Sequence, residues 1–221
     1  MSINNFLANI GANGGMSYSN NFVVKFVDPP VPIPGKVVGS GNYFEMFCDE
    51  AQLPNSSTAT GEIKGRYVGE GSVNYAHTRV FSEFQLGFQC DANMTALKFL
   101  QSWYGWIYND LPVTGVGLNL SLLEGAAIPD ASRSIQLNYP EDYCRPILIT
   151  KTEMGGNNSA ERASITYRME RAWPFAIDAV PLQFGSSQIT KVTAQFHYTR
   201  HTVYTNDITN NDQWKQLVRR N

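Results

Sequence analysis

Two histidines near the C-terminal end of the chain, His197 and His201, have a spacing that could suggest a metal site. The surrounding residues alternate as in a β-strand, where four residues span roughly 13 Å at about 3.3 Å per residue. At that separation two imidazoles cannot bind one ion without a bulge. His77 has no pattern of cysteines or carboxylates near it. We therefore expect three exposed histidines and no metal site.

Two pairs of acidic residues are the next candidates, because general acid–base catalysis often uses two carboxylates. These pairs are Asp49–Glu50 and Glu141–Asp142. Strand geometry would point adjacent side chains to opposite faces of a sheet, so neither pair would converge on a substrate. We interpret both pairs as solvated turn residues.

The sequence offers little support for a nucleophile or a nucleotide-binding loop. Cys144 has no partner that the sequence identifies, and no Gly-x-Ser-x-Gly elbow occurs. The glycines of residues 115–117 lack the third glycine of a dinucleotide-binding loop. Cys48, Cys90 and Cys144 show no CxxC spacing and are expected to be reduced and buried. We therefore expect a protein that is not an enzyme and that uses no cofactor.

Two expected strands have one apolar face and one neutral polar face. Residues 84–90 alternate between apolar and polar side chains, which is typical of a strand buried on one side. Residues 189–204 alternate in the same way and are expected to form one long strand. Further strands are predicted at residues 22–27, 43–48, 114–122, 146–153 and 164–171.

The connections between these strands are also expected from the sequence. Residues 22–27 and 43–48 are expected to pair as a long-looped hairpin, and Trp173-Pro174 is expected to end a strand and pack in the core. Asn93 is expected to cap a helix at residues 93–108 that carries an aromatic stripe.

The composition favours a β-protein that assembles with a partner. Apolar residues make up 43% of the chain and charged residues only 16%, so the polar faces of the sheet are nearly uncharged. An ordinary solvent-facing sheet would carry more lysine and glutamate to block edge pairing. The formal net charge of -2 offers no basic surface for tight binding of nucleic acid. We expect no secretion signal and no membrane segment.

Residues 43–108 and 165–204 carry a resemblance to a known family. The first block contains a strand ending in Leu-Pro, a long loop, an alternating strand and an aromatic helix. The second contains a strand running into Trp-Pro and then a last long strand. This order resembles the tail tube protein of contractile-tailed, T4-like bacteriophages, which is similar in fold to the type VI secretion tube protein. The segments at 28–42 and 109–140 look longer than in compact members of the family.

The resemblance implies a mainly β subunit with a β-sandwich or barrel-like tail tube fold, one flanking α-helix and long loops. It implies a single domain over residues 1–221 that includes an N-terminal arm at 1–20, an inter-ring loop at 53–73, an insertion at 109–140 and a C-terminal arm at 206–221. Hexameric rings would stack into a tube, and double-stranded DNA would pass through its lumen during ejection.

Two sets of residues are assigned to these surfaces as expectations. The lumen is expected to be lined by Glu83, Gln85, Gln89, Thr193, Gln195 and His197. The contacts between rings are expected to involve Leu53, Pro54, Arg66, Tyr67 and Val68.

The partners implied by the resemblance are copies of the chain itself, the tail sheath protein, and the baseplate and tail terminator proteins. The location implied is the tail of a virion, assembled in the host cytoplasm. Two alternatives remain open. One is a tube-initiating baseplate protein or tail terminator of the same fold. The other, from a different class, is a β-sandwich carbohydrate-binding module, which would explain exposed aromatic residues.

Overall fold

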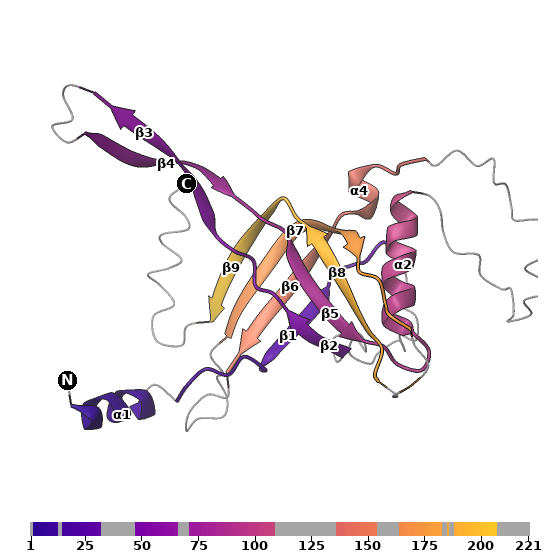
Figure 1. The fold of residues 1–221 in the computed structure, drawn as a ribbon, viewed down its shortest axis with the longest axis horizontal. Helices are drawn as coiled ribbons and strands as arrows, with labels where there is room; N and C mark the ends of the chain where they lie inside the picture. Colours follow the sequence, from indigo (N-terminus) through magenta and orange to yellow (C-terminus); the bar gives the residue numbers. More distant parts are fainter. Residues whose placement is uncertain are drawn as a thin grey trace, which may run out of the picture.

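The computed structural model describes residues 2–12, 15–31, 47–65, 71–108, 136–153, 164–182, 185 and 188–206, and these residues are mainly β (Figure 1). The helices are α1 (Ile3–Ala12), α2 (Thr95–Ile107) and α4 (Pro140–Tyr143). The strands are β1 (Phe22–Phe26), β2 (Cys48–Ala51), β3 (Ser57–Lys64), β4 (Ser72–Val80), β5 (Phe84–Gln89), β6 (Arg145–Thr152), β7 (Ser164–Ile177), β8 (Lys191–His197) and β9 (Arg200–Asn206). The mainly β fold expected from the sequence is confirmed.

An antiparallel, 7-stranded sheet forms the body of the protein. Its strand order is β1-β6-β7-β8-β5-β2, and β9 also pairs with β7. The first part of β7 pairs with β6 and β9, whereas its last part pairs with β8, so this strand joins the two halves of the sheet. The end strands β1 and β2 approach each other, which curls the sheet into a barrel-like body (Figure 1). We call this body the barrel.

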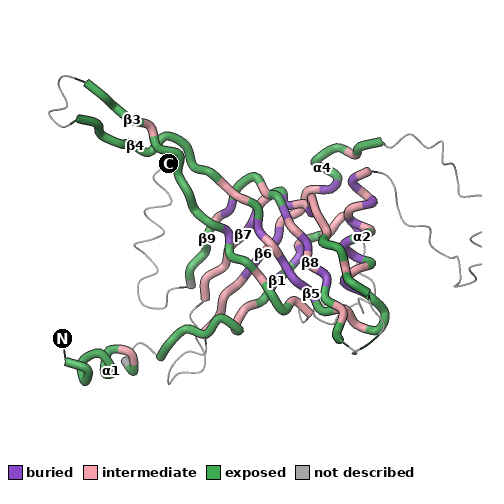
Figure 2. Tube along the Cα trace, viewed as in Figure 1, coloured by how far each residue is buried: buried purple, intermediate pink, exposed green. Residues whose placement is uncertain are grey.

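The core of the barrel is aromatic, and Phe26 of β1 lies at its centre. Its ring centroid is 5.4 Å from that of Phe99 and 5.9 Å from that of Trp103, both on α2. It is also 6.2 Å from the ring of Phe88 on β5 and 6.3 Å from that of Phe196 on β8. All five side chains are buried, and Figure 2 shows the buried residues gathered along β5, β8 and α2. One ring therefore contacts two distant parts of the sheet and the helix that covers them.

Helix α2 confirms the expected aromatic helix but not the expected cap. The carboxylate of Asp91 accepts hydrogen bonds from the backbone N–H of Thr95 at 2.6 Å and from its hydroxyl at 2.8 Å. Asp91 can reach the helix because residues 91–94 form a turn in which the N–H of Met94 donates to the carbonyl of Asp91 at 2.9 Å. Asp91 therefore satisfies the free N–H that Asn93 was expected to satisfy.

The expected strand end at Trp173-Pro174 is wrong, because β7 continues to Ile177. Proline has no N–H to donate to a ladder of hydrogen bonds. The register between β7 and β8 shifts between Pro174 and Ala176, and a shift of this kind tolerates the missing donor. The ring of Trp173 packs against that of Tyr143 in α4, with centroids 5.8 Å apart.

The single long strand expected at residues 189–204 is also wrong. It divides into β8 and β9 at a turn in which the N–H of Thr199 donates to the carbonyl of Glu170 at 3.0 Å. This turn takes β9 away from β8 and onto the first part of β7. Of the hairpin expected from residues 22–27 and 43–48, residues 43–46 lie outside the described residues, and the described strands have other partners: β1 pairs with β6 and β2 pairs with β5.

Residues 53–73 do not form the one continuous loop that the resemblance implied. Residues 57–64 form β3, which pairs with β4 over residues 72–80 as a two-stranded hairpin. Figure 1 shows this hairpin extending well beyond the barrel. We call it the hairpin arm. Its strands pair with each other and not with the seven-stranded sheet. Because both faces of such a ribbon are exposed, its sequence need not alternate between apolar and polar residues, and the strands are hard to predict from sequence.

Several expected segments lie outside the described residues. These are the strand predicted at 114–122, most of the insertion at 109–140, and the C-terminal arm beyond residue 206. Within the expected N-terminal arm, residues 3–12 form α1, which projects from the barrel (Figure 1).

The position of Phe26 generates a test of the core. Phe26→Ala should lower the free energy of unfolding by about 3–5 kcal/mol, because it leaves a cavity that four other rings line. Val23→Ala is a matched control on the same strand, since Val23 is 44% exposed on the opposite face. It should change the free energy of unfolding by about 0.5 kcal/mol or less. If urea denaturation showed equal losses in the free energy of unfolding for the two variants, this description of the core would be contradicted.

Candidate functional site

A polar face of the sheet runs across the paired strands β5 and β8. Gln85 lies opposite Gln195, and Gly87 lies opposite Thr193. Gln89, at the end of β5, lies opposite Lys191. The alternate residues of both strands point into the core and are buried, as the alternation in the sequence predicted. We call the outward side chains of Gln85, Gln89, Lys191, Thr193 and Gln195 the polar face.

The remaining two residues assigned to the lumen lie at the margins of this polar face. Glu83 is exposed and precedes β5, so no strand pairing fixes its direction. His197 ends β8 and is exposed, with its ring stacked on that of Phe175 at a centroid distance of 3.9 Å. The structure therefore brings four of the six residues together on adjacent strands and places the other two beside them.

An ion-pair cluster on the polar face was missed by the sequence analysis. The ammonium of Lys191 lies 2.7 Å from the carboxylate of Glu50 and 3.3 Å from that of Asp49. The hydrogen bond from Lys191 to Glu50, which outweighs partial desolvation, raises the pKa of the lysine. The interpretation of Asp49–Glu50 as a divergent pair is wrong, because a register shift between Cys48 and Glu50 lets both carboxylates approach one lysine.

Gly87 provides the space for this cluster. A Cβ atom at that position would lie 2.8 Å from Cε of Lys191 and 3.1 Å from Cβ of Glu50. The lysine stem therefore crosses the backbone of β5 where no side chain is present. The other acidic pair, Glu141–Asp142, is exposed in α4, in agreement with its interpretation as solvated.

The polar face and its margins are close to neutral or acidic. Lys191 is the only lysine or arginine in β2, β5 and β8, and two carboxylates surround it. Such a surface has no cation left to bind a phosphate anion. Its glutamines and threonine can bind water, so the face suits contact with solvent or with a passing polyanion.

The hairpin arm carries an exposed apolar face. Ile63 pairs with Val73 in register, and Tyr75 lies opposite Gly61, so these side chains share one side of the ribbon. Ile63 is 50% exposed, and Val73 and Tyr75 are each 44% exposed. A Cβ atom on Gly61 would lie 2.4 Å from the ring of Tyr75, so the glycine lets this ring lie flat on the ribbon. An isolated two-stranded ribbon is marginally stable in water, and a partner surface would stabilise it.

The residues assigned to contacts between rings lie on or near this arm. Leu53 is 41% exposed just before β3, whereas Pro54 is buried within the subunit. Arg66, Tyr67 and Val68 lie between β3 and β4, outside the described residues.

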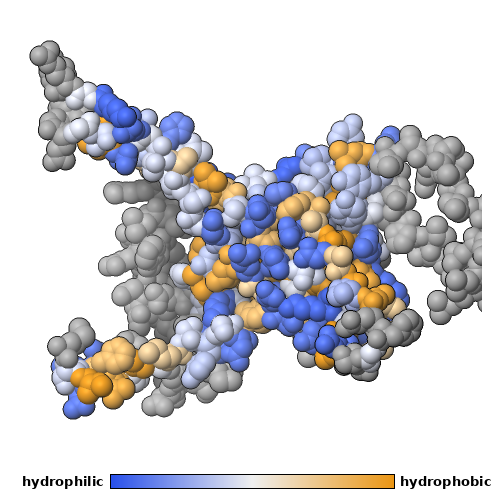
Figure 3. Space-filling view, in the orientation of Figure 1, coloured by the Kyte–Doolittle hydropathy of each residue, from blue (hydrophilic) through white to orange (hydrophobic). Residues whose placement is uncertain are grey.

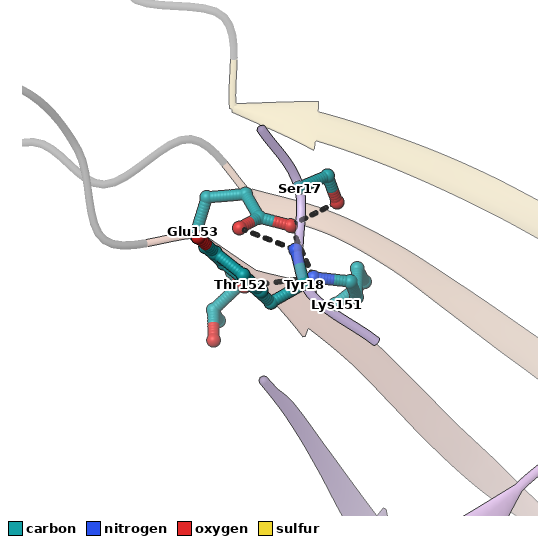
Figure 4. Close-up of polar contacts among 5 residues, drawn as sticks. All are labelled: Ser17, Tyr18, Lys151, Thr152 and Glu153. Carbon is teal, nitrogen blue, oxygen red and sulfur yellow. Dashed lines mark hydrogen bonds and ion pairs between the residues drawn. The ribbon is translucent and has the colours of Figure 1, made fainter. Parts of the chain in front are cut away.

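The N-terminal arm is tied to the end of β6 (Figure 4). The carboxylate of Glu153 accepts hydrogen bonds from the hydroxyl of Ser17, the backbone N–H of Tyr18 and the ammonium of Lys151. These donors, with Lys151 first, lower the pKa of Glu153. The arm then continues into α1, whose Ile3, Phe6 and Leu7 are exposed and form the apolar surface seen in Figure 3.

The histidines do not behave alike. His77 and His197 are exposed, as expected, but His201 is only 3% exposed and lies at the base of the hairpin arm. Its Nε2 is 3.0 Å from the guanidinium of Arg79, which can only donate. His201 therefore faces a cation through this nitrogen. Within the described part of the chain, no group of three or more histidine, cysteine or acidic residues could hold a metal ion.

The three cysteines are free and half-buried, which is less than the full burial expected. Burial raises the pKa of the Cys48 thiol to about 12 and also raises the pKa values of Cys90 and Cys144. These thiols are protonated at neutral pH, and a thiolate is the form that reacts. Among the described helices, none is long and apolar enough to cross a membrane.

The fold is similar to that of a solved contractile injection system chain, and two further solved structures are similar at lower scores. A chain of the sheath–tube complex of an extracellular contractile injection system in its extended state is similar at 14% identity, with a TM-score of 0.51, over 90% of this chain and 97% of that one. A chain of the anti-feeding prophage baseplate is similar at 12% identity and a TM-score of 0.48, over 86% and 97%. A type six secretion system protein is similar at 10% identity and a TM-score of 0.40, over 84% of this chain and 83% of that one. Comparison with curated protein sequences gave no match.

The family comparison covers most of the chain. Residues 17–204 match the model of the phage tail tube protein family. The match includes most of the barrel, the polar face and the hairpin arm. The chain therefore belongs to the phage tail tube protein family and has a structural role in a tube.

Proposed function

We propose that this chain forms hexameric rings that stack into the inner tube of a contractile tail, and that double-stranded DNA passes through the tube during ejection. The observation that carries the proposal is the polar face of β5 and β8 in a member of the tail tube family. Its outward side chains are glutamines, a threonine and one paired lysine, whereas the solvent-facing sheet of a monomer would usually carry more charge.

Ring closure is supported by the free edges of the sheet. Within the described strands, β9 pairs only with β7, so its other edge has N–H and C=O groups available for a neighbour. Exposed strand edges favour pairing with another chain, and a closed ring removes the edge altogether. Copies of one chain that close in this way enclose a bore that one face of the sheet can line.

The chemistry of the polar face suits a bore through which DNA moves. Glutamine and threonine side chains make no ion pairs with phosphates, and the one lysine is already paired with Asp49 and Glu50. Arginines in this place would hold DNA through contacts that depend on salt. We assign Gln85, Gln89, Thr193 and Gln195 to the wall of the lumen, with Glu83 and His197 at its margins.

Stacking of rings is assigned to the hairpin arm and the N-terminal arm. The apolar face of Ile63, Val73 and Tyr75 needs a surface that covers it, and Leu53 is exposed beside it. Arg66, Tyr67 and Val68 belong to the same arm and are assigned to this contact. Pro54, which is buried, would support the arm from within the subunit.

The other partners follow from membership of the family. The tail sheath protein would surround the tube, the baseplate and tail terminator proteins would meet its ends, and the complete tail would form in the host cytoplasm as part of a virion. A tube-initiating baseplate protein or terminator of the same fold would form single rings and would not polymerise freely.

Assembly can be tested directly by negative-stain electron microscopy of the purified chain across a concentration series, with light scattering on the same samples. We expect rings at low concentration and tubes with a central bore at high concentration. Single rings that never stack would favour the initiator or terminator. Monomers at every concentration, even with a preformed tube end as template, would contradict the proposal.

The role of the apolar face of the hairpin arm in stacking can be tested by introducing one charged side chain into it. Val73→Asp should raise the concentration needed for stacking by at least about tenfold, or about 1.4 kcal/mol, because the carboxylate would lose its water at the contact. Thr60→Asp is the matched control, since Thr60 is exposed on the opposite side of the same ribbon and lies opposite the uncharged Ala76. If both variants stacked alike in light scattering, the apolar face would not be the contact.

The wall of the lumen can be tested by adding cations. Gln85→Arg should leave ring assembly intact but place several guanidinium groups in the bore, where they hold DNA at low salt and release it as salt rises. Gln101→Arg on the exposed side of α2 is the control. Only Gln85→Arg tubes should retain DNA that is protected from nuclease. Protection in both variants or in neither would contradict the assignment.

A further inference from the structure

The base of the hairpin arm is built around one buried imidazole. His201 of β9 receives contacts from two residues of the arm, Ser56 before β3 and Arg79 near the end of β4. The hydroxyl of Ser56 lies 3.3 Å from Nε2 of His201, and the guanidinium of Arg79 lies 3.0 Å from the same nitrogen. On the other side of the ring, Nδ1 lies 3.3 Å from the hydroxyl of Tyr198. His201 of the barrel therefore contacts both chain segments at the base of the arm.

The donors around His201 fix its protonation state. Arginine has five N–H donors and no acceptor, so Nε2 must offer a lone pair to Arg79. The proton of the neutral ring is therefore on Nδ1, which donates to the hydroxyl oxygen of Tyr198. Only this neutral tautomer satisfies both contacts. A second proton would remove the acceptor on Nε2 and place two cations next to each other.

Among the described residues, none that contacts His201 has a negative charge that would compensate a second proton. The rings of Phe81, Tyr167 and Tyr198 pack around the imidazole at centroid distances of 5.3, 6.0 and 5.8 Å. Phe81 follows β4 and also lies under Arg79, whose guanidinium carbon is 4.8 Å from the ring centroid. The ionisable groups that face His201 are thus Arg79 from β4, Tyr167 from β7 and Tyr198 from the turn before β9. Among the described contacts of His201, none involves a carboxylate.

We propose that His201 is an acid-sensitive anchor that holds the hairpin arm against the barrel while it is neutral and releases the base of the arm when it is protonated. Protonation removes the lone pair on Nε2 that accepts from Arg79, and repulsion between the imidazolium and the guanidinium then favours separation. The arm is otherwise a separate two-stranded sheet, so its base is the place where its direction is set.

The direction of the pH dependence follows from the environment. Burial first, and then the charge of Arg79, lower the pKa of His201 below its ordinary value. A group with a lowered pKa in the anchored state takes up its proton more readily once the arm is released. The anchor is therefore fully effective above about pH 6.5, the ordinary pKa of histidine, and weakens as the pH falls from there toward the lowered value.

This inference deepens the proposed function, because the arm it controls is the arm assigned to stacking. Its test nevertheless uses the dilute, unassembled full-length chain. If the chain failed to form tubes but its arm responded to pH as described, the stacking assignment would fail and the anchor would stand. If tubes formed but the arm did not respond to pH, the anchor proposal would be rejected and the stacking assignment would stand.

Hydrogen exchange measured by mass spectrometry on residues 72–83 tests the anchor. After correction for the intrinsic pH dependence of exchange, this segment should exchange up to about tenfold faster at one pH unit below the ordinary histidine pKa than at neutral pH. His201→Gln should remove this acceleration, because glutamine keeps an acceptor and a donor but does not titrate. His77→Gln is the matched control, since His77 is exposed on β4, and it should behave like the unmodified chain.

Other outcomes of the hydrogen-exchange experiment would overturn the role of His201 as an anchor. Equal exchange at both pH values in the unmodified chain, or an acceleration that persists in His201→Gln, would overturn the proposal. If His201→Gln did not fold, an NMR titration of the three imidazoles in the unmodified chain would replace it. A His201 ring that titrates at or above the ordinary value for histidine would overturn the anchor, and one that titrates below that value would support it.

Discussion

The contact of Phe26 with four other aromatic rings is the constraint on which the rest of the structure depends. Phe26 belongs to β1, at one end of the strand order, and it packs against Phe88 and Phe196 in the other half of the sheet. A flat sheet could not bring these residues together, so burial of the rings requires the sheet to curl. Once it is curled, β5 and β8 must turn their neutral side chains outward, and the polar face is the consequence.

The curled sheet and the hairpin arm give the subunit two surfaces of opposite chemistry. The polar face has glutamine and threonine side chains and one paired lysine, which suits a surface kept wet. The arm exposes Ile63 and Val73, which suits a surface that another copy covers. A tube needs both kinds of surface, one for its bore and one for the joints between rings. The two surfaces lie on different sheets, the polar face on the seven-stranded sheet and the apolar face on the two-stranded hairpin arm.

The alternation of apolar and polar residues predicted the strand faces. Features that depend on a bulge or on contacts between distant segments were not predicted. The alternation around Phe88 and Phe196 correctly assigned the buried and outward faces of β5 and β8. The bulge after Cys48 brings two carboxylates to Lys191, and no local pattern signals it. His201 was expected to be exposed, but its burial depends on an arm that is distant in sequence. The resemblance to tail tube proteins supplied the assembly, which single-chain physics could not.

A cryo-electron microscopy map of the assembled particle, with side chains visible, would show directly which surface of the subunit lines the bore. The account predicts a ring whose bore is lined by β5 and β8, with Gln85 and Gln195 facing the axis and each hairpin arm contacting the next ring. A map in which the polar face points to the outside of the particle, or is buried between copies, would contradict it.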